Sequence, residues 1–262
     1  MDRSIPATAG IPLHSLIRDV GLLAYFHAYR RYCGSYLGFA WSLLSPLATI
    51  GAYYLVFRIF FRVPIDYFAI YLAAGLMPWI CLVNSISASA VELSNQRRVL
   101  ENNLSSPLIY LYATVIAEWA FLVAAYIALA IIVIAAGLGS WKMLTLPFFL
   151  LPLFVFTMAS SVIVGYLGAH FRDIPHLLRL FFQAAFWFVP IVYHWSLVPD
   201  AISGFIQYNP FSLLISPSQI ILHGASFPNS TLVVTGSLLA IGWVGIAVLI
   251  HRKLSRRIVF YL

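Results

Sequence analysis

Charged side chains are scarce in this sequence of 262 residues. Asp, Glu, Lys and Arg together make up 9% of the chain, whereas they make up about 25% of an average soluble domain. Hydrophobic residues account for 62%, and the mean hydropathy is +0.94. A water-soluble fold of this length could not cover so much apolar surface. The composition therefore excludes an ordinary soluble protein and predicts a polytopic membrane protein.

Cysteine and lysine are almost absent. Cys33 and Cys81 are the two cysteines, so neither a disulfide framework nor a cysteine-ligated zinc site is indicated. The only lysines are Lys142 and Lys253, and neither lies in the Gly-rich run of a phosphate-binding loop. If ATP drives this protein, another chain must therefore bind and hydrolyse it together with Mg²⁺. We expect no cofactor on this chain.

The seven histidines are scattered along the sequence. None has the His-x-x-x-His or His/Glu spacing that places two metal ligands on one helix face. No Ser–His–Asp constellation can be placed on one side of a membrane. The sequence therefore predicts neither a metal site nor an enzyme. Residues 1–10 lack a basic start followed by an apolar run, so no secretory signal is expected.

Long apolar runs are abundant. A bilayer core about 30 Å thick needs roughly 20 apolar residues per helix, and six runs meet that length. The predicted spans are 37–61, 68–91, 108–137, 144–169, 177–195 and 231–251. We therefore predict an all-α fold with six transmembrane helices in a single domain, residues 1–262. Prolines 46, 78, 152 and 190 fall inside spans, where neighbouring helices can satisfy the carbonyls that each proline frees.

Two segments are too polar to span a bilayer. In residues 11–33, apolar side chains recur at helical spacing but are interrupted by charges, a pattern that suits an amphipathic helix lying in the membrane interface. Residues 92–107, ELSNQRRVLENNLSSP, also have one apolar side and predict a short surface helix. The alternative for 92–107 is an ordinary solvated loop whose arginines set the topology.

The basic residues orient the bundle. With both termini in the cytoplasm, all of the 15 Lys and Arg residues except Arg58, Arg62 and Lys142 lie on the cytoplasmic side. This is a strong positive-inside pattern. It explains the net charge of +7 without a nucleic-acid partner, and it places 92–107 in the cytoplasm.

The segment 196–230 then faces outward and contains no Lys or Arg. Apolar residues recur through it, and prolines and a glycine break it into short pieces. We expect two short helices that dip into the outer leaflet or cap the bundle.

Glu118 is the one carboxylate deep in a predicted span. A charged side chain at the bilayer centre costs about 2.5–3.5 kcal/mol on insertion scales, so such residues are functional candidates. Glu118 could act in a proton relay. The alternative, favoured by the lack of a second acid or histidine nearby, is a structural residue that holds helices together.

Aromatic residues are dense in 181–195, FFQAAFWFVPIVYHW. Interfacial belts and lipid-facing packing explain most aromatic residues of a membrane protein. Aromatic faces also stack on the apolar faces of sugar rings. The run could therefore form a wall for a polysaccharide.

Five short motifs occur in one order along the chain. They are 37–46 (LGFAWSLLSP), 75–79 (GLMPW), 171–174 (FRDI), 190–193 (PIVY) and 208–211 (YNPF). Together with the six-span layout, they resemble the membrane subunits of type-2 ABC exporters for bacterial surface polysaccharides. The resemblance covers about 13–257. The chain departs from many relatives just before Pro107, where NNLSS stands in place of a Lys and an aromatic residue.

The resemblance implies a permease that pairs as a homodimer with two copies of a separate ATP-binding subunit in the bacterial inner membrane. Residues 11–33 would be a gate helix, 92–107 the coupling helix and 196–230 the outer gate helices. The cargo would be a polyprenyl-pyrophosphate-linked glycan such as O-antigen. The expected ATPase-coupling residues are Glu92, Arg97, Arg98, Glu101, Arg172 and Asp173. The expected substrate-channel residues are Arg30, Arg31, Tyr36, Trp41, Phe182, Phe186, Trp187 and Tyr193.

Alternatives remain at this stage. Arg30 and Arg31 suit bidentate binding of a pyrophosphate, but positive-inside anchoring explains them equally well. An ion-coupled secondary transporter that uses Glu118 would need no ATPase partner. Within the exporter class, the cargo could also be capsule, teichoic acid, a drug or a lipid. A membrane-embedded enzyme of glycolipid assembly is disfavoured because no acid–base cluster is present.

Overall fold

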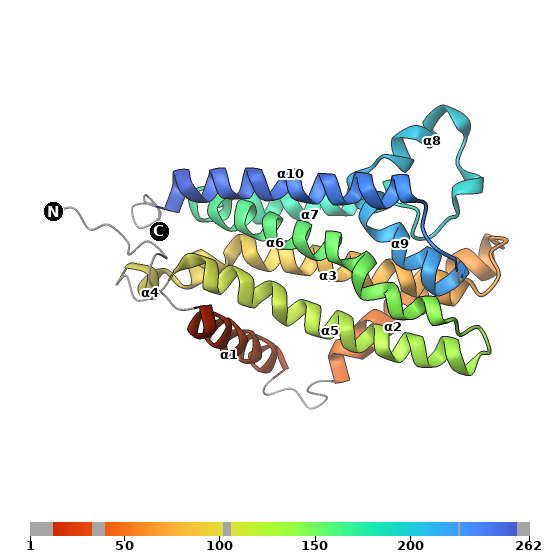
Figure 1. Ribbon diagram of the computed structural model, residues 1–262, viewed down its shortest axis with the longest axis horizontal. Helices are drawn as coiled ribbons and strands as arrows, with labels where there is room; N and C mark the ends of the chain where they lie inside the picture. Colours follow the sequence, from red (N-terminus) through yellow and green to blue (C-terminus); the bar gives the residue numbers. More distant parts are fainter. Residues whose placement is uncertain (1–12, 33–39, 102–105, 225, 256–262) are drawn as a thin grey trace.

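The computed structural model describes residues 13–32, 40–101, 106–224 and 226–255 (Figure 1). Within these ranges the protein is almost entirely helical and contains no strand. The long helices run roughly parallel along one axis (Figure 1). The predicted all-α class is therefore confirmed.

Four helices in the described ranges are long and apolar enough to cross a membrane. They are α3 (Phe68–Asn95), α5 (Pro107–Ala135), α6 (Leu146–His170, preceded by a 3₁₀ turn at Trp141–Thr145) and α10 (Ser230–Leu254). They correspond to the predicted second, third, fourth and sixth spans. The chain is therefore a multi-pass membrane protein.

The predicted first and fifth spans are shorter in the structure, so the count of six is not established. The first comprises α2 (Ala40–Tyr54) and a π-helical turn, Leu55–Phe60. Its predicted start lies outside the described residues, and its apolar part, Leu44–Phe60, is shorter than the four long spans. The fifth comprises α7 (Ile174–Ala185) and a 3₁₀ turn, Phe186–Phe188.

The prediction of one continuous helix over 177–195 is wrong. Helical structure ends at Phe188, and Val189 has an extended backbone with φ −114° and ψ 130°. The physical reason is Pro190, because a proline disfavours the helical conformation of the residue before it and cannot donate a backbone hydrogen bond.

Side chains of neighbouring helices bind the irregular backbone after Phe188. The Tyr71 hydroxyl on α3 donates to the carbonyl oxygens of Pro190 at 2.7 Å and Tyr193 at 2.9 Å. The Gln219 amide on α9 (Pro210–Gly224) donates to the Pro190 carbonyl at 3.2 Å. Non-helical backbone is tolerated at membrane depth only where the protein satisfies its polar groups. These contacts meet that condition.

Pro78 lies inside α3 and removes the hydrogen bond that the Ala74 carbonyl would accept in a regular helix. Two other helices replace it. The hydroxyl groups of Tyr126 on α5 and Ser218 on α9 donate to that carbonyl at 2.8 and 3.0 Å. The expected satisfaction of a freed carbonyl by neighbouring helices is confirmed at this proline.

Helix α3 is the centre of the bundle and packs against α5, α6 and α9. Small residues let the backbones approach closely. A Cβ atom built on Gly168 of α6 would overlap the carbonyl oxygen of Ala90 on α3. Such small-residue contacts are typical of helix packing in membranes, where lipid leaves no hydrophobic driving force between helices.

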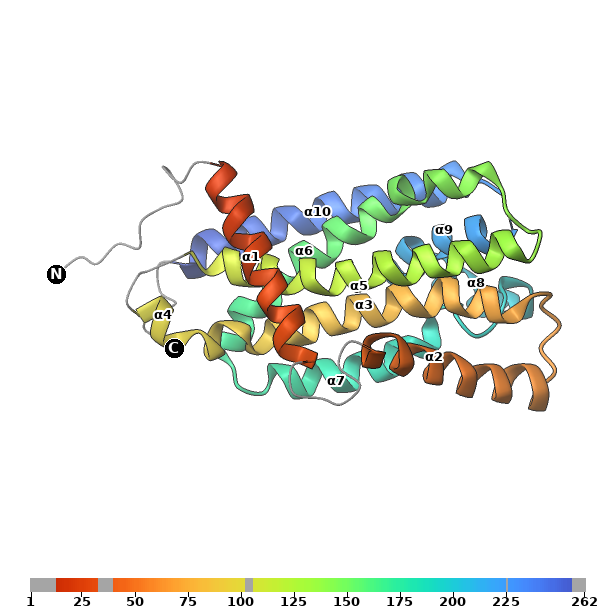
Figure 2. The same ribbon diagram turned by 90° about the horizontal axis from the view of Figure 1, so that it is seen from below.

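Shorter helices surround this core. Helix α1 (Leu13–Tyr32) crosses α5 obliquely (Figure 2), with Val20 and Ala24 buried against the α5 surface. Helix α4 (Arg97–Glu101) lies at the same end of the bundle as the C-terminal end of α10 (Figure 1). The predicted 92–107 helix is interrupted at Gln96, because α3 continues to Asn95 and α4 begins at Arg97. Residues 102–105 of that prediction lie outside the described ranges.

Residues 196–230 contain the two expected short helices, α8 (Asp200–Gln207) and α9. Helix α8 lies at the end of the bundle opposite α4 (Figure 1). Helix α9 is largely buried and packs against α3, α6 and α10. It is therefore part of the core of the bundle. A role of either helix as a gate stays a prediction.

Candidate functional site: a polar groove along α3 and α5

Two adjoining hollows follow the surface formed by α3 and α5, and together we call them the polar groove. The larger has a volume of about 590 Å³ and reaches α1. The smaller has about 110 Å³ and reaches α2. The two share Asn84, Glu118 and Phe121. These three residues therefore occupy the middle of a groove that leads from the end of α1 to the start of α2.

The middle of the groove contains a cross-helix hydrogen bond. The Asn84 side-chain amide on α3 donates to Glu118 Oε2 on α5 at 3.3 Å. Both side chains are half-buried. Asn84, Ser87 and Ala88 recur at helical spacing on α3, as Thr114, Glu118 and Phe121 do on α5, so each helix presents one face to the groove.

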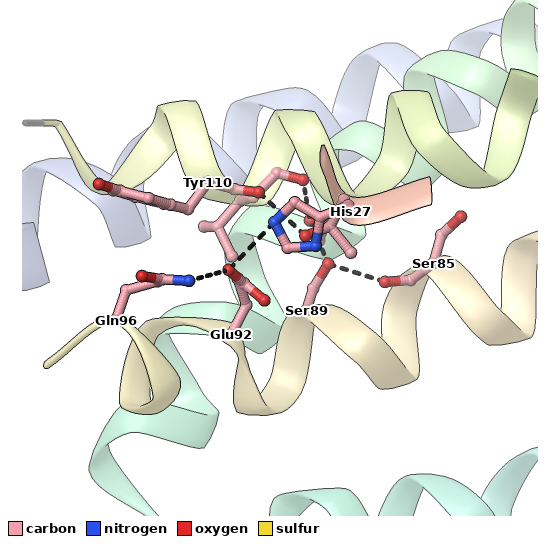
Figure 3. A network of polar contacts seen from close by, with 9 residues as sticks. His27, Ser85, Ser89, Glu92, Gln96 and Tyr110 are labelled. Atoms are coloured by element: carbon pink, nitrogen blue, oxygen red, sulfur yellow. Dashed lines mark hydrogen bonds and ion pairs between the residues drawn. The ribbon is translucent and has the colours of Figure 1, made fainter. Parts of the chain in front are cut away.

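The α1 end of the groove is basic. Arg30 lies in the last turns of α1, is exposed and lines the larger hollow with His27. His27 Nε2 lies 3.4 Å from Glu92 Oε1 on α3 (Figure 3). Glu92 also accepts a hydrogen bond from the Gln96 amide at 3.1 Å. The carboxylate thus joins α1 to the end of α3 that leads into α4.

Next to Glu92 along α3, where Figure 3 shows Ser89 and Ser85, hydroxyl groups join three helices. The Ser89 hydroxyl on α3 lies 2.6 Å from the Ser161 hydroxyl on α6 and donates to the Ser85 carbonyl at 2.7 Å. The Ser161 hydroxyl donates to the Leu111 carbonyl on α5 at 3.3 Å. Interhelical hydrogen bonds of this kind hold membrane helices together, so these contacts join α3, α5 and α6 one turn of α3 away from Glu92.

The structure brings some of the predicted substrate residues together and separates others. Arg30 and Trp41 lie at opposite ends of the polar groove, and Trp41 is exposed. Tyr36 and the side chain of Arg31 lie outside the described residues.

The remaining predicted aromatic residues belong to another part of the molecule. Phe182 and Phe186 are buried in the protein's own core, where their rings pack on Trp79 at centroid distances of 6.0 and 5.8 Å. Trp187 is exposed, and the half-buried Tyr193 donates a hydrogen bond to its carbonyl at 3.0 Å. Their role in a substrate path stays a prediction.

The predicted coupling residues gather at the α4 end. Arg97 and Arg98 are exposed on α4. Arg172 and Asp173 are exposed in the turn between α6 and α7, which lies at the same end (Figure 2). The side chain of Glu101 lies outside the described residues. Glu92 is buried, so it lies behind the surface that the arginines form.

The sequence analysis missed Asn84 and separated Glu118 from the substrate residues. A signal was present, because Asn84 is a polar side chain inside an apolar span, as Glu118 is. What the sequence did not reveal is that the two lie opposite each other between Arg30 and Trp41. That pairing depends on the register of α3 against α5.

The described helices and the polar groove define a multi-pass α-helical membrane protein. No family model matches the chain. It is 28% identical to an O-antigen export system permease protein RfbA of Klebsiella pneumoniae over 87% of this chain and 88% of that protein. A second such protein of Klebsiella pneumoniae is 25% identical over 74% of this chain and 76% of its own length. The protein of that name from Myxococcus xanthus is 27% identical over 76% and 78%. The resemblance to membrane subunits of polysaccharide exporters is thereby confirmed.

Proposed function

We propose that this chain is the transmembrane subunit of an ATP-driven exporter that moves a lipid-linked, O-antigen-like polysaccharide across the bacterial inner membrane. The observation that carries the proposal is the similarity to three O-antigen export permeases over 74–87% of the chain. Short motifs could be shared by chance, but matches over 198–232 residues extend far beyond such motifs.

A separate ATPase subunit binds at the α4 end in this proposal. The exposed arginines of α4 and the exposed turn between α6 and α7 lie at the same end of the bundle (Figure 2). The positive-inside pattern supports a cytoplasmic location for this end and for both termini. ATP and Mg²⁺ are bound by the partner, and closure of the partner moves α4 together with α3.

In this proposal two copies of the chain form a homodimer, and the path of the polysaccharide lies between them. Helices α2 and α7 cover one side of the bundle, and many of their apolar side chains are exposed within the single chain. On α7 these include Leu177, Leu180 and Phe181, which are 58%, 65% and 52% exposed. A second copy related by a twofold axis, the commonest symmetry of oligomers, would cover these side chains in place of lipid.

An ion-coupled secondary transporter is the second candidate. Glu118 favours it, because a carboxylate within a transmembrane helix is a candidate for proton transfer. The two candidates differ in their partner, since only the exporter needs an ATPase.

Co-purification tests the proposal. The tagged chain is extracted in mild detergent from its host cells, and we expect an ATPase subunit in equal amount. Reversal of Arg97 and Arg98 to Glu should remove the ATPase. The matched control reverses Arg62 and Lys142, which lie on the opposite side of the membrane, and should retain it. Absence of an ATPase from the wild-type preparation, with transport that follows the proton gradient, would overturn the proposal in favour of ion coupling.

A further inference from the structure

The Asn84–Glu118 pair combines two kinds of hydrogen-bonding group. An ionised carboxylate only accepts hydrogen bonds, and a side-chain amide offers two N–H donors and one carbonyl acceptor. One N–H of Asn84 is directed to Glu118 Oε2. Both residues line both hollows of the polar groove, so the pair faces the groove from its middle.

Vicinal hydroxyl groups of a sugar match this pair. Each hydroxyl donates one proton and accepts others, so one hydroxyl can donate to the carboxylate while its neighbour accepts from the amide. Aromatic rings border the same place, because Phe121 lines both hollows and Trp41 lines the smaller one. Aromatic faces pack on the apolar faces of sugar rings.

The charges along the groove give a bound molecule a direction. Arg30 at the α1 end attracts phosphate groups, for which a guanidinium is well suited. Glu118 in the middle repels them, because like charges interact unfavourably. A molecule with a phosphate at one end and a neutral sugar at the other therefore fits with its phosphate at Arg30 and its sugar at Glu118.

We propose that Asn84 and Glu118 form a binding site for the hydroxyl groups of the sugar that follows the phosphate of a lipid-linked glycan. The inference rests on the proposed function, since it assigns a subsite for that cargo. It also gives Glu118 a role in hydrogen bonding in place of proton transfer.

Binding of short soluble probes to the purified complex tests the site. The probes are farnesyl pyrophosphate and its conjugates with N-acetylglucosamine, galactose and mannose. The measured quantity is the ratio between the Kd of farnesyl pyrophosphate and the Kd of each conjugate, because this ratio isolates the contribution of the sugar. We expect at least one conjugate to bind the wild type about tenfold more tightly than farnesyl pyrophosphate, the effect of one hydrogen bond to a charged group.

Three variants and one control are compared. Glu118→Leu and Asn84→Leu should bring the ratio to about 1. The Kd of farnesyl pyrophosphate should stay unchanged in Asn84→Leu and should not rise in Glu118→Leu, which removes a carboxylate that repels phosphate. Glu118→Gln keeps a hydrogen-bonding side chain of the same size and should retain most of the ratio and of polysaccharide export. The control is Ser237→Ala on α10, whose hydroxyl donates to the Val233 carbonyl of its own helix. This substitution should change neither the ratio of the Kd values nor polysaccharide export.

The outcomes separate this inference from the proposed function. If no conjugate binds the wild type more tightly than farnesyl pyrophosphate, or if the leucine variants keep the wild-type ratio, the sugar site is wrong although the ATPase co-purifies. If Glu118→Gln abolishes export as completely as Glu118→Leu, Glu118 acts in proton transfer and the proposed role in sugar binding is wrong. If no ATPase co-purifies and farnesyl pyrophosphate itself does not bind, the proposed function fails as well.

Discussion

His27 on α1 and Glu92 on α3 face each other with Nε2 and Oε1 3.4 Å apart (Figure 3). The Glu92 side chain is 8% exposed, whereas that of His27 is 27% exposed. Arg30 at the groove follows His27 by three positions on α1, and Glu92 lies in the last turn of α3 before α4. The contact therefore links the basic end of the groove to the segment expected to contact the ATPase.

We predict that His27 and Glu92 stabilise the protein as a unit. Removal of either partner by alanine leaves the other without its counterpart, so the two single variants and the double variant should show a coupling energy of roughly 0.5–3 kcal/mol. The measurement is a double-mutant cycle on the midpoint of thermal unfolding in detergent. Additive effects of the two substitutions would show that the contact contributes nothing.

Polysaccharide export by the same variants gives a second test of the His27–Glu92 contact. If the contact transmits movement of α4 to α1, His27→Ala should lower polysaccharide export while the amount of co-purified ATPase stays at the wild-type level. Loss of the ATPase together with export would instead show that the variant is misfolded.

The contact between α3 and α6 gives a second prediction. A methyl group at Gly168 meets the backbone carbonyl of Ala90, which cannot rotate away as a side chain can. Gly168→Ala should therefore lower the free energy of unfolding by about 1–3 kcal/mol, the usual cost of overpacking. Gly242→Ala is the matched control, because a Cβ atom built on Gly242 of α10 meets no neighbouring helix or other side chain of the described residues within 4 Å. It should be neutral or slightly stabilising, since alanine favours helices more than glycine does.

Pro78 gives a third prediction. Tyr126→Phe combined with Ser218→Ala leaves the Ala74 carbonyl without either of its hydroxyl donors. An unsatisfied buried acceptor costs about 1–3 kcal/mol, so the double variant should unfold at a lower temperature. Adding Pro78→Ala restores a backbone N–H four residues after Ala74 and should recover part of the loss. No recovery on this third substitution would contradict the explanation.

The sequence predicted the four long helices well, because their apolar runs exceed the length that a bilayer requires. It failed at 177–195, where composition favours a span but Pro190 ends the helix and Tyr71 and Gln219 bind the released backbone. Those two side chains come from segments more than a hundred and about thirty residues away. Local patterns cannot reveal such partners, and for the same reason Asn84 and Glu118 could not be paired before the structure placed α3 beside α5.

Gly75 and Gln219 give the last prediction. A Cβ atom at Gly75 of α3 would overlap the Gln219 side-chain amide, which donates to the Pro190 carbonyl. Gly75→Ala should therefore displace Gln219 and weaken the attachment of the irregular segment after Phe188. The expected loss is about 0.5–1.5 kcal/mol, the net contribution of one hydrogen bond, because the Tyr71 hydroxyl still donates to the Pro190 carbonyl. Gln219→Ala removes the same hydrogen bond and should cost a similar amount.

The double variant Gly75→Ala/Gln219→Ala should be no less stable than Gln219→Ala alone. Once the Gln219 side chain is removed, the new methyl group at position 75 no longer overlaps it. Thermal unfolding of the four proteins measures this, and a double variant that loses the sum of both single effects would show that Gly75 is needed for another reason.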